Sequence, residues 1–254
     1  NRGIKYFDNY LKNKPFIFTA NRSECMIPGT LHYKKRCSVM WFLSFIKTSI
    51  GKKLVMATSG FLLLSFLAIH AFGNAAIYMG SKYFQIYADA LHGFPVLVLI
   101  FGLGLLAVFI AHIGVGLLLF FEKRKTSARY NVQARVVENT FASRTMPYTG
   151  AFIFLFLIIH VFGFGIAKPE DVKISILVQE YLSGFFYSLF YIISFIALAI
   201  HLNHGFWSML QTFGINHPRY NCLISILTIA VPVLCLVIFG GIPIYFMTSG
   251  GAGY

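Results

Sequence analysis

The chain has 254 residues, of which 57% are hydrophobic and only 11% charged, and its mean hydropathy is +0.72. This composition excludes a soluble globular domain and a disordered chain, and it indicates an integral membrane protein. The formal net charge is +13, but the Lys and Arg residues flank apolar runs and form no stripe with interleaved aromatic residues. That distribution favours a membrane topology signal over a nucleic-acid partner.

Residues 1–39 are basic and have no sustained hydrophobic periodicity, so we treat them as an N-terminal extension and assign them no function. We expect residues 40–254 to form one transmembrane domain, which begins with a short interfacial helix over residues 40–51. The four cysteines have no CxxC spacing, and they therefore predict neither an iron–sulfur cluster nor a covalently attached haem.

Five apolar runs follow, each longer than the roughly 20 residues needed to cross the hydrocarbon core of a bilayer. They cover residues 54–79, 94–121, 147–167, 182–211 and 221–247. The sequence thus predicts an all-α integral membrane protein with five transmembrane helices. Of the 21 Lys and Arg residues, all but Lys82, Lys168 and Lys173 fall on one side of these helices. This bias places the N-terminus inside and the C-terminus outside.

Four of the runs each carry a histidine, and the spacing of these histidines indicates an internal repeat. His70 and His160 are 90 residues apart, and His112 and His201 are 89 residues apart. The segment Phe-Leu-Ala-Ile-His70-Ala-Phe-Gly also resembles Phe-Leu-Ile-Ile-His160-Val-Phe-Gly. Such self-similarity at a fixed period is the sequence signature of a duplicated unit.

The depths of the four histidines point to haem. A titratable side chain inside a bilayer is costly unless it faces the bundle interior and has a partner. At 1.5 Å per residue, His70 and His160 lie at one level and His112 and His201 at another, about 9 Å further in. Because an iron porphyrin needs two axial ligands at one height on opposed helices, we expect helices one to four to form a four-helix bundle around two stacked haems b. Hydrogen-bonded or proton-relay histidines are the alternative.

Each of these histidines is followed three or four residues later by a glycine, on or near the same helix face. The glycines are Gly73, Gly116, Gly163 and Gly205. A missing side chain there would admit a flat macrocycle, although ordinary small-residue helix contacts are an equal alternative. His204 could replace His201 as a ligand. We prefer His201 because its spacing to Gly205 matches that of His112 to Gly116.

The outer ends of the helices contain candidate residues for a quinone. His92 stands with Asp89 at the predicted outer mouth of the second helix, close to the outer haem level. A quinol needs a proton acceptor at such a place. Glu180 is a second outer carboxylate, but a solvated helix start explains it equally well.

Four segments together resemble the dihaem cytochrome b membrane anchor of succinate dehydrogenase and fumarate reductase, of the single-polypeptide, five-helix type. They are Ser-Ile-Gly51-Lys-Lys-Leu-Val-Met-Ala-Thr-Ser-Gly60-Phe, Ala-His112-Ile-Gly-Val-Gly, residues 150–160, and His201-x-x-x-Gly-Phe-Trp-Ser. The resemblance covers roughly residues 45–247. It departs from some members at Ala199, where they have a glutamate implicated in proton movement.

The resemblance implies that His70 and His160 bind the distal haem b, and that His112 and His201 bind the proximal one near the inner face. It also implies a flavoprotein subunit carrying FAD, an iron–sulfur subunit on the basic inner surface, and menaquinone or another quinone as substrate. Quinone reduction or quinol oxidation would then occur at this subunit of a respiratory-chain or tricarboxylic acid cycle complex. The complex would lie in a prokaryotic cytoplasmic membrane, and it could dimerise.

Two other functions remain open from the sequence. One is a haem b anchor for another respiratory dehydrogenase, of hydrogenase or formate dehydrogenase type. The other is a transporter without haem that uses the histidines as a proton relay. The chain has no flavin or nucleotide fingerprint, so any chemistry on succinate or fumarate must take place in another subunit.

Overall fold

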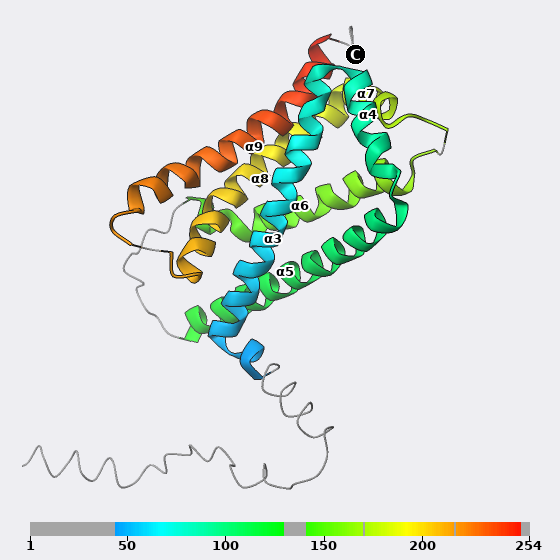
Figure 1. Cartoon of the computed structure of the whole chain (residues 1–254). Helices are drawn as coiled ribbons and strands as arrows, with labels where there is room; N and C mark the ends of the chain where they lie inside the picture. Colours follow the sequence, from blue (N-terminus) through cyan, green and yellow to red (C-terminus); the bar gives the residue numbers. More distant parts are fainter. Residues whose placement is uncertain (1–43, 130–140, 170, 216, 250–254) are drawn as a thin grey trace, which may run out of the picture. The chain divides into compact units, whose positions relative to one another are not determined.

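The computed structural model describes residues 44–129, 141–169, 171–215 and 217–249, and all regular structure in these ranges is helical (Figure 1). The contacts divide the chain into two units, Asn1–Phe45 and Ile46–Tyr254, and the helices named below belong to the second. The basic extension over residues 1–39 and the start of the predicted interfacial helix lie outside the described residues.

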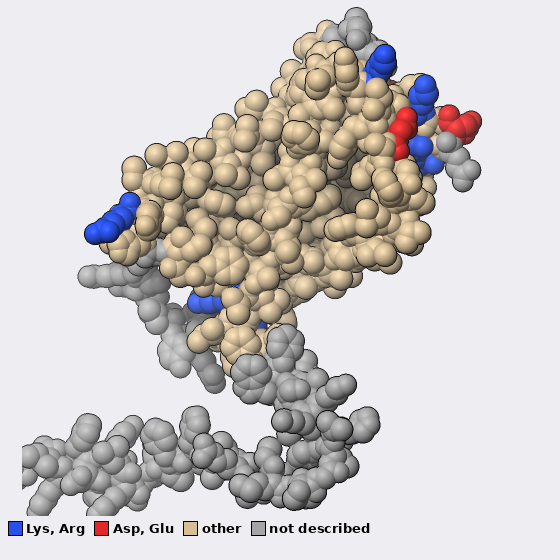
Figure 2. Space-filling view, viewed as in Figure 1, with Lys and Arg blue, Asp and Glu red and all other residues tan. Residues whose placement is uncertain are grey.

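Five helical stretches are long and apolar enough to cross a membrane, which confirms the predicted number. They are Ser49–Met79, Pro95–Lys125, Arg144–Ile166, Phe185–Thr212 and Asn221–Thr248. The long helices within them are α3 (Ser49–Ala75), α5 (Pro95–Arg129), α6 (Phe141–Val161), α8 (Phe185–Thr212) and α9 (Asn221–Ser249). On the face shown in Figure 2, charged side chains gather at the ends of the helices and the surface between them is uncharged. These features are those of a multi-pass membrane protein.

Local chemistry sets several helix boundaries. The Thr48 hydroxyl accepts a hydrogen bond from the Gly51 N–H at 3.0 Å and so caps the start of α3. Pro95 opens α5, where its missing N–H costs nothing. The first turn of α3 and the C-terminal part of α5 are joined by an ion pair between Lys52 and Glu122.

Two short helices, α4 (Ser81–His92) and α7 (Ile174–Ser183), show that the internal repeat includes the connections between the long helices. The order α3, a 3-10 turn, α4 and α5 matches the order α6, a π-helical turn, α7 and α8, with α9 added at the end. Each half has two long helices, so both halves begin on the same side of the membrane. The two halves therefore form a parallel repeat and not an inverted one. α4 packs against α7, and the Ser175 N–H donates to Gln85 Oε1 at 3.2 Å.

The fourth span predicted from the sequence, over residues 182–211, begins three residues before the observed one, Phe185–Thr212. Residues 182 and 183 belong to α7, and Gly184, with φ −74° and ψ 124°, separates α7 from α8. This extended backbone interrupts the helix, although the hydrophobic run continues across it. Composition alone therefore could not locate the break.

Helix α8 is the centre of the packing, because α9, α6 and α3 all lie against it. The buried core is rich in aromatic residues and is formed by these helices together with α4, α7 and the 3-10 turn. Its most buried members include Ile77, Leu182, Tyr191, Phe239, Ile242 and Phe246. By contrast, α5 packs on α3 and α4, and none of its most apolar window is buried within the chain.

Helix α9 continues through two prolines, and side chains of the bundle donate hydrogen bonds to backbone carbonyls near both. Pro232 has no N–H to donate to the Thr228 carbonyl one turn earlier. Asn203 of α8 donates to that carbonyl through Nδ2 at 3.0 Å. Near Pro243, the Tyr78 hydroxyl donates to the Ile238 carbonyl at 2.8 Å. These hydrogen bonds attach α9 to both halves of the repeat.

Replacing Asn203 with leucine is expected to lower the free energy of unfolding by about 1 to 3 kcal/mol, because the buried Thr228 carbonyl loses its donor. Thermal unfolding of the purified protein in one fixed detergent measures the change. In a Pro232→Ala background the new N–H can reach the Thr228 carbonyl, so the same substitution should cost less. An equal cost in both backgrounds would contradict this explanation.

Candidate functional site

The structure brings the four membrane histidines together in two pairs. His70 of α3 faces His160 of α6 with 6.0 Å between ring centroids, and His112 of α5 faces His201 of α8 with 6.5 Å between centroids. These are the partners expected from the 90- and 89-residue spacings. His204 lies about one turn beyond His201, within electrostatic reach of Lys123 of α5.

The His112–His201 pair is held by two hydroxyl groups at equivalent places in the repeat. His112 Nδ1 lies 3.0 Å from Ser59 Oγ, and His201 Nδ1 lies 3.3 Å from Thr149 Oγ1. Each hydroxyl donates its own proton to a carbonyl of the preceding turn, that of Met56 or Met146, at 3.1 Å. Each oxygen is therefore an acceptor for the Nδ1–H, which leaves the Nε2 lone pair available for a metal.

Two glycines set how closely these imidazoles approach the neighbouring helices. A Cβ added to Gly60 of α3 would lie 3.5 Å from His112 Cε1, and one added to Gly150 of α6 would lie 3.4 Å from His201 Cε1. These two glycines, and Ser59 and Thr149, were not among the site residues predicted from the sequence. Their own 90-residue spacing was the available signal.

The four glycines selected from the sequence lie against side chains of neighbouring elements. Gly116 faces Met56 and Gly205 faces Met146, again at equivalent positions of the repeat. Gly73 faces the ring of Tyr87, and Gly163 faces the phenol groups of Tyr187 and Tyr181. This geometry agrees with the alternative of close helix contacts, and the role of these glycines beside a macrocycle stays a prediction.

The His70–His160 pair has aromatic surroundings and a different set of hydrogen bonds. Phe66 stacks on His70 and Phe156 stacks on His160, each with 5.4 Å between centroids. His160 Nδ1 lies 3.1 Å from the Tyr191 hydroxyl oxygen. Near His70, the Asn74 amide donates to the His70 carbonyl at 2.8 Å and lies 3.4 Å from Nε2. The 3.4 Å contact between the Asn74 amide and His70 Nε2 is a weak hydrogen bond, and a metal could take the place of the amide.

The residues expected at a quinone site lie on the two short helices. Asp89 and His92 belong to α4 rather than to the start of the second long helix, and Glu180 belongs to α7; all three are exposed. Asp89 accepts a hydrogen bond from Gln85 Nε2 at 2.6 Å, and His92 Nδ1 donates to the Ala88 carbonyl at 2.7 Å. Both side chains are therefore bonded within α4 itself.

Two facing imidazoles match the number of protein ligands that haem iron takes, and they are fewer than a bare zinc ion takes. In the described part of the chain, no three His, Cys, Asp or Glu side chains gather as a metal site. A structural or catalytic zinc ion takes three or four protein ligands. In haem, the porphyrin supplies four nitrogens to the iron, and the protein needs to supply only two more ligands. An imidazole nitrogen binds a metal at about 2 Å, so the ring centres of two trans imidazoles lie roughly 6 Å apart, close to the distances in both pairs.

Comparisons of this chain with protein-family models, with curated proteins and with solved structures found no match. What the fold and the site define is a class: a helical membrane protein in which two similar halves, each with two long helices, are followed by a further long helix, and in which imidazoles face one another in two pairs.

Proposed function

We propose that this chain is a dihaem membrane anchor that passes electrons between an iron–sulfur subunit and a membrane quinone, as part of a succinate:quinone or quinol:fumarate oxidoreductase. The observation that carries the proposal is the pairing of the four imidazoles, at 6.0 Å and 6.5 Å between ring centroids. His70 and His160 would hold one haem b, and His112 and His201 the other.

When bound, haem b supplies reversible one-electron chemistry. The contribution of the chain is to fix and tune the axial ligands. Ser59 and Thr149 accept from the Nδ1–H groups of His112 and His201, which orients both rings and makes them more basic. The aromatic rings around His70 and His160 keep the environment of that pair apolar.

The assignment to the succinate dehydrogenase and fumarate reductase class rests on the sequence resemblance and on the absence of a flavin or nucleotide fingerprint from the sequence. More than half of the residues lie in the five apolar spans, and a flavoprotein and an iron–sulfur subunit would carry out the dicarboxylate chemistry. The basic segments would lie on the cytoplasmic face of a prokaryotic membrane, with the C-terminus outside. Co-purification with flavin and with malonate-sensitive activity would support this class against a hydrogenase or formate dehydrogenase anchor.

A histidine-relay transporter is the competing class of function. A relay requires imidazoles that exchange protons along a path. The Nδ1 atoms of His112 and His201 instead face hydroxyl groups whose own protons are bound to carbonyls. The two classes of function predict different haem contents. The proposed function predicts a Soret band, and two haems b per chain in a pyridine haemochrome assay of the purified protein. The transporter predicts none, and a result of no haem would reject the proposal.

Replacing Tyr191 with phenylalanine is expected to raise the midpoint potential of the haem held by His70 and His160. With its Nε2 on iron, His160 would carry its proton on Nδ1, and the Tyr191 oxygen 3.1 Å away would accept from it. Losing this acceptor would make the imidazole a poorer donor to oxidised iron. One hydrogen bond corresponds to roughly 20 to 60 mV for a one-electron couple. Redox titration of the two haem signals measures the shift. The other haem, and both haems in a Tyr148→Phe control, should be unaffected; equal shifts of both haems would contradict the assignment.

A further inference from the structure

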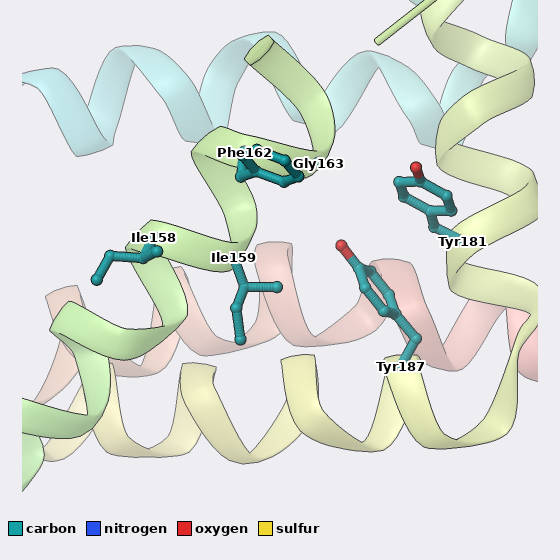
Figure 3. Close-up of a pocket in the computed structure, with 6 residues that line it drawn as sticks. All are labelled: Ile158, Ile159, Phe162, Gly163, Tyr181 and Tyr187. Atoms are coloured by element: carbon teal, nitrogen blue, oxygen red, sulfur yellow. The ribbon is translucent and has the colours of Figure 1, made fainter. Parts of the chain in front are cut away.

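A cavity of about 270 Å³ opens between α6, α7 and α8, close to the His70–His160 pair. Its lining residues, drawn in Figure 3, are Ile158, Ile159, Phe162, Gly163, Tyr181 and Tyr187. The walls are apolar except for two phenol hydroxyls. None of the quinone residues selected from the sequence lines this cavity.

A wide helical turn creates the space. The Ala167 N–H donates to the Phe162 carbonyl five residues earlier, at 2.8 Å, and this π-helical turn ends α6. Such turns are frequent at functional sites. Gly163 lies in the turn, and a Cβ added there would lie 3.3 Å from the Tyr187 hydroxyl. In Figure 3 the Tyr187 hydroxyl points toward this turn. In the first half of the repeat, the ring of Tyr87 lies against the equivalent Gly73.

Two hydroxyls connect the cavity to an imidazole of the candidate haem site. The Tyr187 hydroxyl, on the cavity wall, lies 3.2 Å from the Tyr191 hydroxyl, and Tyr191 lies 3.1 Å from His160 Nδ1. Hydrogen-bonded chains of this kind polarise one another in an apolar environment. A change in the hydrogen bonding of the Tyr187 hydroxyl therefore alters the hydrogen bond at His160.

The position and the lining restrict the occupant. Ile158 to Gly163 and Tyr187 belong to the apolar spans, so a ligand must be soluble in lipid. The cavity is slightly smaller than the roughly 300 to 1,000 Å³ of sites that enclose a whole ligand, so it suits a ring whose tail lies in the bilayer. The phenol hydroxyls favour a ring that carries oxygen atoms.

We propose that this cavity binds the ring of a membrane quinone, with the Tyr187 hydroxyl donating to a ring oxygen and the Tyr187–Tyr191 pair linking that oxygen to His160. The inference deepens the proposed function and rests on it. Tyr187 binds the quinone, whereas Tyr191 is a positioning residue that acts through His160.

Photolabelling with a short-chain azido-naphthoquinone tests the site on the full-length chain, purified with its bound subunits and placed in lipid nanodiscs. Peptide mass spectrometry should find the label within residues 158–163 and 181–187, and unlabelled menadione should compete for it. Ile158→Trp, which enlarges a residue of the cavity wall, should reduce the labelling at least tenfold. The control Ile176→Trp, on the exposed side of α7, should leave the labelling unchanged.

Two tyrosine variants separate binding from linkage. Tyr187→Phe should weaken naphthoquinone binding about three- to tenfold, the effect of one hydrogen bond. Tyr191→Phe should change binding less than twofold. The shift in haem potential that naphthoquinone causes in the parent protein should be absent from both variants.

Label on α4 around Asp89 and His92, labelling that persists in Ile158→Trp, or bound phospholipid with no specific label would each overturn the inference. A haem count on the same samples keeps the two proposals apart. Two haems without label in the cavity would reject the quinone site and leave the proposed function intact. Label in the cavity without haem would support the binding site and reject the proposed function.

Discussion

Alanine at any one of the four paired histidines is expected to remove one haem b from the purified protein, and members of a pair should remove the same one. His70→Ala and His160→Ala should lose one spectral component, and His112→Ala and His201→Ala the other. In the proposed function each haem would be held by two facing imidazoles from opposed helices, so losing one of them would remove most of the binding. Pyridine haemochrome counts and the remaining haem spectrum measure both outcomes.

His204→Ala and His92→Ala are the matched controls, and both should keep two haems. His204 is the informative control because it lies on the same helix as His201. If His201→Ala kept both haems and His204→Ala lost one, the ligand role would pass to His204. If all four paired variants kept both haems, the histidine pairs would not be the ligands.

Valine at Gly60 or Gly150 is expected to remove the haem of the His112–His201 pair while leaving the other haem in place. A Cβ at either position would only touch the imidazole, at 3.5 Å or 3.4 Å from Cε1. The branched methyl groups of valine extend about 1.5 Å further and would overlap the ring. Overpacking of this kind typically costs about 1 to 3 kcal/mol, and here the imidazole must move to relieve it.

Alanine at the same two positions should be tolerated, because its Cβ makes an ordinary contact and alanine favours the helix over glycine by about 1 kcal/mol. Gly102→Val on α5, where nothing lies within 4 Å, controls for valine in a membrane helix. Haem content and the low-spin spectrum report the result. Full haem content in Gly60→Val and Gly150→Val would show that these glycines do not position the imidazoles.

The sequence predicted the five spans and the histidine pairs because both depend on regularities that a bilayer enforces. Hydrocarbon thickness sets the length of an apolar run, and the 90-residue repeat places His70 with His160 and His112 with His201 once the helices are counted. Neither inference requires knowledge of which side chains touch. Hydropathy and the internal repeat were therefore enough to predict the spans and the histidine pairs.

The features that were missed depend on contacts between helices. α4 and α7 are short helices in the connections, without the length that identifies a span, and Gly184 separates α7 from α8 within a continuous apolar run. Ser59 and Thr149 are common small polar residues in a membrane helix. Their hydrogen bonds to the imidazoles follow from the crossing of α3 with α5 and of α6 with α8.

The chain from the cavity to His160 was the least predictable feature because it occurs in only one half of the repeat. Residues equivalent in spacing to Tyr187 and Tyr191 lie in α5 at about positions 98 and 102, which are valine and glycine. Internal symmetry therefore directs attention away from the two tyrosines. Only the distances between their hydroxyls and His160 Nδ1 connect them to the site.

An electron cryomicroscopy map of the purified protein, at a resolution that shows side chains, tests the central claim most directly. We expect a porphyrin between His70 and His160 and a second between His112 and His201, with iron bonded to an imidazole nitrogen on each side. Imidazoles that contact only side chains or water, with no macrocycle between them, would contradict the redox function.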